Sequence, residues 1–435
     1  MNKLIQKIRT SIQNLMKRGA FHIVAGSFLT KFVSFFGSVF LVRFLSKADY
    51  GILGYYENIF GYFTILAGCG LAGGLQRHIV LMETLPRQQG CYLTALRFGT
   101  LWNIGLVAVC AGFMLFYPHP AAFSGYPAAT LALTACIPVL FVLNASLITL
   151  RATFQNRIYA ILAFVTSATQ ILARIVGAYI GGLNGTTLFR FLAEVVCAAG
   201  VFLWLRRRVF DQIVPQAPSW EEIRSLRTYS TQMMFTDGLW AVFMLNDLFL
   251  LGQLCGSETL VADYKVAYVI PANISIFVAA IGVFVAPYFT KYENEGDYVW
   301  VRKNFLTLLK VNSSVMGAAA LACFILAKPL ILLLYGEDYL SAVPIMRVLL
   351  VASFFNNGIR SAIANVLSAM GKQKQNLYVA GAGMVIQVTL DLLCIPRFGV
   401  IGVAWASATV YFIMAFLLCA VFWKHYFRNP HSKQT

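Results

Sequence analysis

Charged side chains interrupt the long apolar segments of this 435-residue chain, and their types suggest the chemistry of a polar site. Eight of them are basic and five are acidic. Three basic ones, Arg97, Lys265 and Lys310, lie near a segment end, where a long side chain reaches water or a lipid headgroup. The others are the candidate functional residues: Lys31, Arg174, Arg190, Arg347 and Arg360, with Glu57, Glu194, Asp237, Asp247 and Asp391.

The positions of the basic candidates indicate a hydrated cavity. Lys31 and Arg360 lie near the middle of their apolar segments, where a charge costs about 3 kcal/mol or more unless it faces water or a partner. Lys31 and Arg174 share helix faces with serine or glutamine, and Arg360 flanks a polar stripe that includes Asn357. Serine and glycine stripes also allow helices to pack closely in lipid, but the charged members favour a cavity.

An interior with more basic than acidic residues favours an anionic ligand. Arginine pairs with phosphate through two parallel hydrogen bonds, so a phosphate-bearing substrate is the expected ligand. The expected substrate contacts are Lys31, Arg174 and Arg360, together with Arg190, Arg347 and Asn357. The acidic residues either neutralise these cations or hold a coupling ion, a proton or sodium, and the sequence leaves both roles open. No catalytic residue, cofactor or structural metal is expected.

Composition defines the elements that must position these residues. Of the chain, 59% is hydrophobic and 12% charged, whereas soluble domains carry about 25% charged residues. About 20 apolar residues are needed for a helix to cross a bilayer. The sequence predicts an all-α polytopic membrane protein with twelve spans, at 20–42, 51–75, 93–117, 127–149, 158–180, 185–205, 229–252, 264–289, 305–327, 340–369, 376–395 and 400–423.

The distribution of lysine and arginine predicts the topology. With both termini in the cytoplasm, 22 basic residues fall in cytoplasmic segments and four in the opposite loops, as the positive-inside rule requires. Most of the net charge of +17 is thereby explained, and no basic soluble face remains for nucleic acid. The expected organisation is a cytoplasmic amphipathic N-terminus (1–19), a six-helix lobe (20–205), a cytoplasmic linker (206–228), a second six-helix lobe (229–423) and a cytoplasmic tail (424–435).

A short repeat relates the two lobes. Ala48-Asp49-Tyr50 recurs 214 positions later as Ala262-Asp263-Tyr264, in each case in a short polar break between apolar runs. At this offset the first two spans align with the seventh and eighth. Because six spans separate the copies, both breaks fall on the same side of the membrane. The repeat therefore predicts two lobes related by a parallel pseudo-two-fold axis along the membrane normal.

The motifs of soluble enzymes are missing from the sequence. No GxxxxGK[ST] phosphate-binding loop occurs, and the five histidines have no metal-ligand spacing. A membrane-bound glycosyltransferase or polymerase is the alternative from another class, and it would usually carry a large loop with acidic catalytic residues. The longest polar interval here, 206–228, is basic. A transporter is therefore favoured over an enzyme.

Four stretches resemble one family of transporters. VRFLSKADYGILGYYENI, MLNDLFLLGQL followed by ADYKVAY, LLYGEDYLSAVPIMRVL, and IPRFGVIGVAWASA are similar to segments of the polysaccharide and oligosaccharide flippases. These belong to the multidrug/oligosaccharidyl-lipid/polysaccharide exporter superfamily, which also includes lipid II flippases and MATE drug antiporters. The resemblance extends over nearly the whole chain and identifies the superfamily rather than a substrate.

The resemblance implies the function of an O-antigen or capsule-unit translocase in lipopolysaccharide or capsule biosynthesis. Such a protein moves an undecaprenyl-diphosphate-linked oligosaccharide across the bacterial inner membrane by alternating access, with membrane lipids and polysaccharide polymerase machinery as further partners. A MATE-type cation-coupled multidrug antiporter is the alternative. MATE proteins carry functional acids in span one or span seven; here span one presents Lys31, but Asp237 and Asp247 in span seven keep that alternative open.

Overall fold

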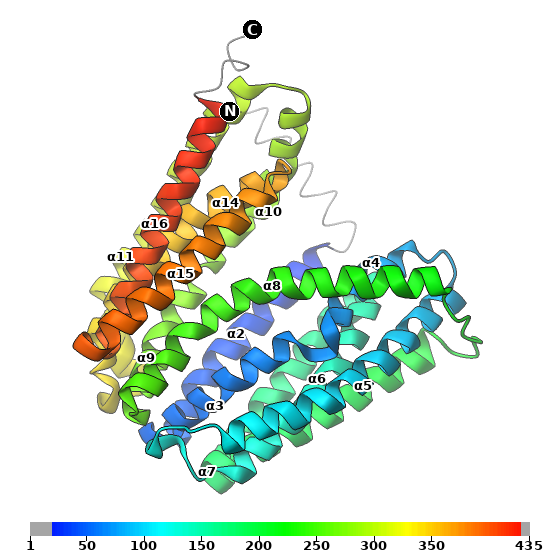
Figure 1. Cartoon of the computed structure of the whole chain (residues 1–435), viewed down its shortest axis with the longest axis horizontal. Coiled ribbons are helices and arrows are strands. Elements are labelled where there is room, and N and C mark those ends of the chain that lie inside the picture. Colours follow the sequence, from blue (N-terminus) through cyan, green and yellow to red (C-terminus); the bar gives the residue numbers. More distant parts are fainter. Residues whose placement is uncertain (1–19, 428–435) are drawn as a thin grey trace. The chain divides into compact units, whose positions relative to one another are not determined.

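The computed structural model describes residues 20–427, and the expected amphipathic N-terminus (1–19) and the end of the tail lie outside this range. Within it, all regular structure is helical (Figure 1), which confirms the prediction of an all-α membrane protein. Eight of these helices are long and apolar enough to cross a membrane, or nine if one bent pair counts as a span. The exact number of twelve crossings is not fixed by this count.

Contacts between residues divide the chain into two compact units. Of the described residues, the first unit contains 20–119 and 124–241, and the second contains 120–123 and 242–427. The division falls inside α8. This helix begins at Trp220, which lies in the interval 206–228 expected as a linker. The helices of the first unit are α2 (Ala20–Phe44), α3 (Lys47–Ile65), α4 (Leu71–Leu81), α5 (Leu85–Phe116), α6 (Pro127–Ala152), α7 (Asn156–Arg208) and the first part of α8 (Trp220–Cys255).

The expected second span is a broken helix. Ser46 caps the start of α3 by accepting a hydrogen bond from the Asp49 backbone N–H at 3.0 Å. After Ile65 a short 3-10 turn, Ala67–Gly70, carries left-handed backbone at Gly68, and α4 leaves at an angle of 45°. The freed Gly68 N–H donates to the side-chain oxygen of Asn103 at 2.7 Å. Left-handed backbone at Gly68, Cys69 and Gly70, which the two glycines adopt most readily, therefore turns one apolar run into two helices. The hydropathy of the segment does not reveal this break.

Helix α7 contains both the fifth and the sixth expected spans. Its 53 residues are interrupted at Gly181 and Gly182, where the dihedral angles are not helical. A Cβ built on Gly177 would lie 2.3 Å from the carbonyl oxygen of Gly185, although a straight helix would separate these residues by about 12 Å. The chain therefore turns back on itself here, and its two arms touch through glycine backbone.

An apolar core of the first unit lies where α4, α5, α6 and the second arm of α7 meet. Helices α5, α6 and α7 pack side by side, as Figure 1 shows. Leu75, Tyr92 and Leu205 are almost completely buried in this core, and Tyr92 satisfies its hydroxyl group with Ser146 at 2.7 Å.

The second unit is assembled around α16. Its helices after α8 are α9 (Glu258–Asn273), α10 (Ile276–Asn294), α11 (Tyr298–Ile325), α12 (Ala327–Tyr335), α13 (Ala342–Ser353), a π-helix (Phe354–Arg360), α14 (Ser361–Ala369), α15 (Gln373–Phe398) and α16 (Val400–Tyr426). Helix α16 packs against α13, α15 and the π-helix. The expected eighth span, 264–289, is divided between α9 and α10, and the expected tenth span contains the π-helix at its centre.

The repeated tripeptide belongs to helices rather than to the breaks. Asp49 lies in the first turn of α3, and Asp263 lies in the second turn of α9. The preceding helices end at Phe44 and Cys255, and in each case two residues separate that end from the start of the next helix. The sequence interpretation placed Ala-Asp-Tyr in the connectors and is corrected here, because both copies are already helical and their tyrosines are buried.

Candidate functional site

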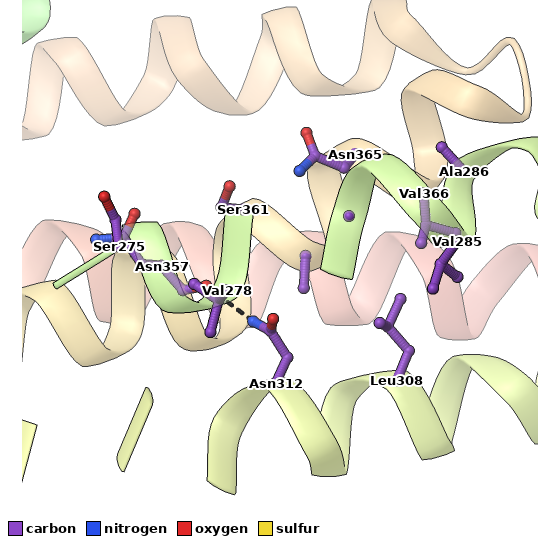
Figure 2. A pocket seen from close by; sticks show the side chains of 12 residues that line it. Ser275, Val278, Val285, Ala286, Leu308, Asn312, Asn357, Ser361, Asn365 and Val366 are labelled. Atoms are coloured by element: carbon purple, nitrogen blue, oxygen red, sulfur yellow. Dashed lines mark hydrogen bonds between the residues drawn. The ribbon is translucent and has the colours of Figure 1, made fainter. Parts of the chain in front are cut away.

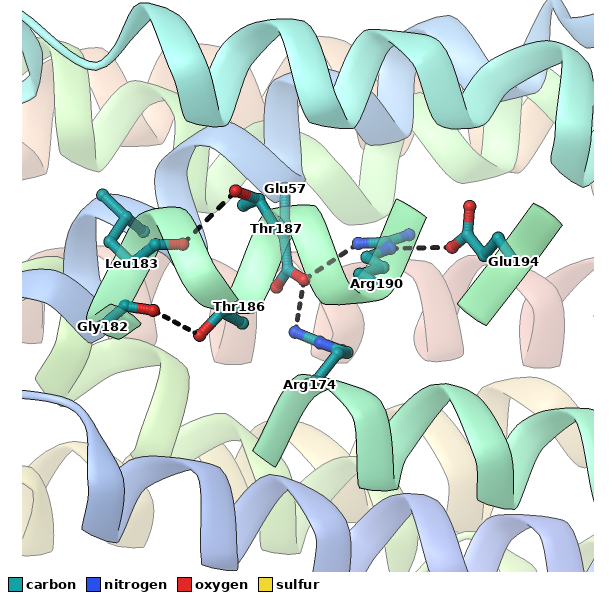
Figure 3. Close-up of polar contacts among 8 residues, drawn as sticks. All are labelled: Glu57, Arg174, Gly182, Leu183, Thr186, Thr187, Arg190 and Glu194. Atoms are coloured by element: carbon teal, nitrogen blue, oxygen red, sulfur yellow. Dashed lines mark hydrogen bonds and ion pairs between the residues drawn. The ribbon is translucent and has the colours of Figure 1, made fainter. Parts of the chain in front are cut away.

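Six of the predicted site residues fall in two groups of buried and partly buried polar side chains, one group in each unit. The first, which we call the glutamate–arginine cluster, consists of Glu57, Arg174, Arg190 and Glu194 (Figure 3). Arg174 Nη2 and Arg190 Nη1 both contact Glu57 Oε1, at 2.5 Å and 3.0 Å, and Arg190 Nε donates to Glu194 Oε1 at 2.8 Å. Glu194 is 2% exposed and the other side chains are 15–23% exposed.

The reversal of α7 explains this arrangement. Arg174 lies on the first arm, and Arg190 and Glu194 lie on the second, so the turn brings both arginines to Glu57 on α3. At the start of the second arm, the Thr186 hydroxyl group donates to the carbonyl oxygen of Gly182 at 2.8 Å. The guanidinium of Arg190 also lies 5.0 Å from the centre of the Phe60 ring. The glutamate–arginine cluster therefore depends on the reversal of α7.

The cluster balances its charges but leaves hydrogen-bonding capacity unused. Two arginines face two glutamates, so the formal charges cancel. Both guanidiniums converge on one oxygen of Glu57, an arrangement that an oxygen of a phosphate group could adopt equally well. Within the described residues, Arg174 Nε and Glu194 Oε2 are buried without a hydrogen-bond partner. The site could therefore accept a further polar ligand atom.

The second group, which we call the carboxylate cluster, lies in the second unit and contains Asn246, Asp247, Tyr264, Gln387, Asp391 and Ser407. Asp247 accepts hydrogen bonds from Ser407 Oγ at 2.6 Å, from Tyr264 Oη at 2.9 Å and from Gln387 Nε2 at 3.0 Å. Gln387 Nε2 also lies 3.1 Å from Asp391 Oδ1, and Asn246 Nδ2 donates to Asp391 Oδ2 at 3.2 Å. One amide group therefore bridges two carboxylates.

Only neutral groups surround these two acids in the part of the chain that the structure describes. No lysine, arginine or histidine there forms an ion pair with Asp247 or Asp391. Two unscreened carboxylates at such a site repel one another, and a proton or a bound cation relieves the repulsion. Oxygen atoms from carboxylates, an amide and a hydroxyl group are the ligands that hard cations prefer.

A polar cavity continues from this cluster. Asp247, Tyr264 and Ser407 line a small cavity of about 40 Å³ together with Asn357. Asn357 also lines a larger cavity of about 150 Å³, into which Asn365 and Ser361 contribute polar groups (Figure 2). None of the described residues that line the larger cavity is charged. Its volume is enough for several water molecules, and its amides and hydroxyl groups could bind them.

The π-helix forms one wall of both cavities. Asn312 Nδ2 donates to the carbonyl oxygens of Asn357 and Gly358, at 2.9 Å and 2.8 Å. A π-helical turn leaves carbonyl groups without regular helical partners, and such turns are frequent at functional sites. Arg360 ends this segment, and its Nε donates to Asn356 Oδ1 at 2.6 Å.

The remaining predicted residues are separate from both clusters. Lys31 has an exposed side chain on α2, and Asp237 has an exposed side chain on α8. Arg347 on α13 lies over the ring of Phe324, with 5.3 Å between the guanidinium carbon and the ring centre. The structure thus brings together Arg174, Arg190 and their two glutamates, and separately Asp247 and Asp391.

Sequence reasoning found one partner of these residues and missed others. Gln387 and Asp391 are four residues apart, and helical spacing alone places them on one face. Ser407, Asn246 and Asn312 gave no comparable signal, because single serines and asparagines are common in apolar helices.

Comparison with known proteins gives this geometry a context. Residues 40–344 match the sequence model of a family described as polysaccharide biosynthesis protein. An uncharacterized membrane protein of Methanocaldococcus jannaschii is 23% identical over 189 residues, which are 42% of this chain and 37% of that protein. The chain therefore spans little more than a third of this curated relative.

Two solved structures show the same fold. An inward-facing multidrug resistance MATE family transporter of the MOP superfamily has a TM-score of 0.76 at 15% identity, covering 93% of this chain and 96% of that one. The lipid II flippase MurJ in an inward closed conformation has a TM-score of 0.72 at 14% identity, covering 92% and 87%. The prediction of a transporter rather than an enzyme agrees with this fold. The match over residues 40–344 covers most of the sequence, and the chain belongs to the polysaccharide biosynthesis protein family.

Proposed function

We propose that the chain is a flippase for an undecaprenyl-diphosphate-linked oligosaccharide in the biosynthesis of a bacterial surface polysaccharide such as O-antigen or capsule. The observation that carries the proposal is the family match over residues 40–344, in a chain with the fold of membrane transporters that include a lipid II flippase. The protein would reside in the inner membrane with both termini in the cytoplasm. It would act beside polysaccharide polymerase machinery.

The glutamate–arginine cluster is the proposed contact for the diphosphate. Arg174 and Arg190 already direct N–H groups at one oxygen atom, and a phosphate oxygen can replace that of Glu57. Glu57 then serves as a competing anion, which holds the two arginines in place while no substrate is bound. Lys31, Arg347, Arg360 and Asn357 are proposed as secondary contacts along the path of the head group, while the polyprenyl tail stays in lipid.

The carboxylate cluster is the proposed site of the coupling ion. Asp247 and Asp391 would bind a proton or sodium ion between them, with Gln387 holding the two acids together. The cavity lined by Asn357, Ser361 and Asn365 would bring water to this site. Glu194 would remain a charge partner of Arg190, and Asp237 a further acidic candidate. Ion binding at the carboxylate cluster and diphosphate binding at the glutamate–arginine cluster would together drive alternating access.

The test of the substrate uses a strain that lacks the gene and accumulates a lipid-linked glycan inside the cell. Arg174→Ala should leave the accumulation uncorrected and the surface glycan absent, while Arg174→Lys should restore part of the export because the charge remains. Arg97→Ala is the matched control, since Arg97 is an exposed arginine outside both clusters. Normal export by Arg174→Ala at normal protein level would contradict the proposed contact. Absence of any accumulated lipid-linked glycan in the deletion strain would overturn the flippase proposal itself.

A MATE-type cation-coupled drug antiporter is the second candidate. The fold of the multidrug resistance transporter and the two acids of the carboxylate cluster favour it. It predicts that Asp247→Asn raises drug sensitivity while surface glycan stays normal, and that the Arg174 variants have little effect. The flippase proposal predicts loss of glycan export in both variants, so the same strains separate the two.

A further inference from the structure

A cavity of about 460 Å³ lies in the first unit, where α5 begins and α7 ends. It is separate from the glutamate–arginine cluster: none of the four cluster residues lines it. Arg206 and Arg207 from the last turn of α7 line one side, and Gln89 and Tyr92 from the start of α5 line the other. Because α5 and α7 both have the length and hydropathy of membrane spans, their ends lie where the bilayer meets water.

The loop 209–219, between α7 and α8, forms the wall opposite these helices, and several contacts fix its conformation. The Gln216 backbone N–H donates to the carbonyl oxygen of Pro86 at 3.0 Å, which ties the loop to the start of α5. Gly90 faces the carbonyl oxygen of Gln216 so closely that a Cβ there would lie 1.8 Å away. Phe210 is 4% exposed, and its ring lies 6.2 Å from that of Tyr92. The cavity is therefore a feature of the packed structure.

The lining combines positive charge with an unused polar group. Arg206 and Arg207 are both exposed, and within residues 20–427 neither forms an ion pair. One acid, Asp211, also lines the cavity. Gln89 is only 9% exposed, and its Oε1 has no hydrogen-bond partner among the described residues. A ligand with a phosphate for the arginines and a hydroxyl group for the glutamine would satisfy both.

Apolar side chains complete the lining and indicate a lipid. Leu93, Phe202 and Ile213 contribute surface that a soluble anion would leave unused but that the glycerol backbone and first methylene groups of a phospholipid would cover. Basic pockets between membrane helices commonly hold anionic headgroups. We propose that this cavity binds the headgroup of an anionic phospholipid of the phosphatidylglycerol type, with its phosphate at Arg206 and Arg207 and a headgroup hydroxyl group at Gln89.

The test measures lipid binding to the purified full chain in neutral detergent, by native mass spectrometry during titration with phosphatidylglycerol or phosphatidylcholine. The chain should prefer phosphatidylglycerol. The double variant R206Q/R207Q should lose at least tenfold in affinity for it, because two charge-assisted contacts disappear. Arg208→Gln is the matched control: Arg208 is the next residue on the same helix, is exposed, and does not line the cavity. It should change the affinity less than twofold.

A second variant tests the space inside the cavity without changing its charge. Leu93→Trp leaves both arginines in place but fills the apolar part, and it should also weaken phosphatidylglycerol binding. Equal losses in Arg208→Gln and in the double variant would indicate attraction by surface charge and overturn the proposal. Unchanged binding in the double variant would overturn it as well. Competition by millimolar inorganic phosphate as strong as that by the lipid would assign the arginines to free phosphate and contradict a lipid site. None of these readouts depends on glycan export.

Discussion

The two buried polar clusters differ in how their acids are compensated. In the first unit, Glu57 and Glu194 face the guanidinium groups of Arg174 and Arg190. In the second unit, Asp247 and Asp391 share an amide and receive other hydrogen bonds from neutral groups. Both clusters place two carboxylates close together inside helical packing, but only the first one supplies the opposite charge from the chain itself.

This difference indicates where an external ion is needed. A buried carboxylate that already pairs with arginine gains little from a cation, and it competes with any anion that approaches the arginine. A buried carboxylate with only neutral donors gains a great deal from a proton or a metal cation. The first cluster is therefore suited to exchanging one anion for another, and the second to binding and releasing a cation.

The largest expected effect comes from breaking the charge balance of the first cluster. Arg190→Leu leaves Glu194, which is 2% exposed, without its arginine, and uncompensated buried charges typically cost about 3–5 kcal/mol. We expect a large fall in the thermal unfolding temperature of the protein in detergent. The double variant R190L/E194L should recover much of this loss, because it removes both charges. A double variant as unstable as Arg190→Leu would show that packing of the arginine, rather than its charge, stabilises the unit.

The sequence predicted the charged residues of both clusters better than the neutral residues that hydrogen-bond to them. Glu57, Arg174, Arg190, Asp247 and Asp391 could be singled out because each is a charge in an apolar segment, whose cost demands compensation. The sequence also predicted helices almost everywhere, since hydropathy follows directly from composition. It could not predict which charges meet, because pairing depends on tertiary packing.

Two breaks within helices show what the sequence can and cannot predict. The reversal of α7 at Gly181 and Gly182 falls between the fifth and sixth expected spans, 158–180 and 185–205, so the sequence predicted a turn here. It did not predict that this turn brings Arg174 to Arg190. The π-helix in the tenth predicted span has no sequence signal of its own, and Asn312, which holds it, lies 45 residues away from Asn357. Features of this kind depend on long-range contacts and need the folded structure.

The next expected effect concerns the turn that assembles the first cluster. Gly177→Ala would place a methyl group against the backbone of Gly185, and overpacking of this kind typically costs about 1–3 kcal/mol. We expect a lower unfolding temperature and weaker glycan export, since the two arms of α7 must separate. Gly200→Ala on the same helix meets no atom within 4 Å and should be neutral or slightly stabilising. Equal behaviour of the two variants would show that the arms are not in close contact.

A comparable loss of stability is expected when the side-chain amide of Asn312, which holds the π-helix of the second unit, is removed. Asn312→Leu removes two hydrogen bonds to the π-helix and leaves the carbonyl oxygens of Asn357 and Gly358 without this donor, at a cost of about 1–3 kcal/mol. Hydrogen–deuterium exchange should increase over Phe354–Arg360. Asn304→Ala on the same helix is the control, because Asn304 donates within its own helix, to the carbonyl oxygen of Trp300 one turn earlier. Unchanged exchange in Asn312→Leu would mean that the π-helix is held by its own neighbours.

The smallest effect on stability should come from the acids of the second cluster, although their effect on ion coupling should be large. Asp391→Asn keeps the shape of the side chain and removes the repulsion from Asp247, but it also turns an amide NH2 group toward the donors Asn246 and Gln387. Because these two contributions oppose one another, the free energy of unfolding in the absence of sodium at neutral pH should change by less than about 1 kcal/mol. In the original protein, a cation that binds the folded state stabilises it by about 2.7 kcal/mol at a hundred times its dissociation constant. Its unfolding temperature should therefore rise with sodium concentration or with falling pH, and that of Asp391→Asn should not.

Glu57→Gln is the contrasting variant: it should lower the unfolding temperature at every sodium concentration, because two arginines lose their shared carboxylate. If Asp391→Asn kept the sodium and pH response of the original protein, the cation would bind elsewhere, and the distinction between an anion-exchanging and a cation-binding cluster would fail.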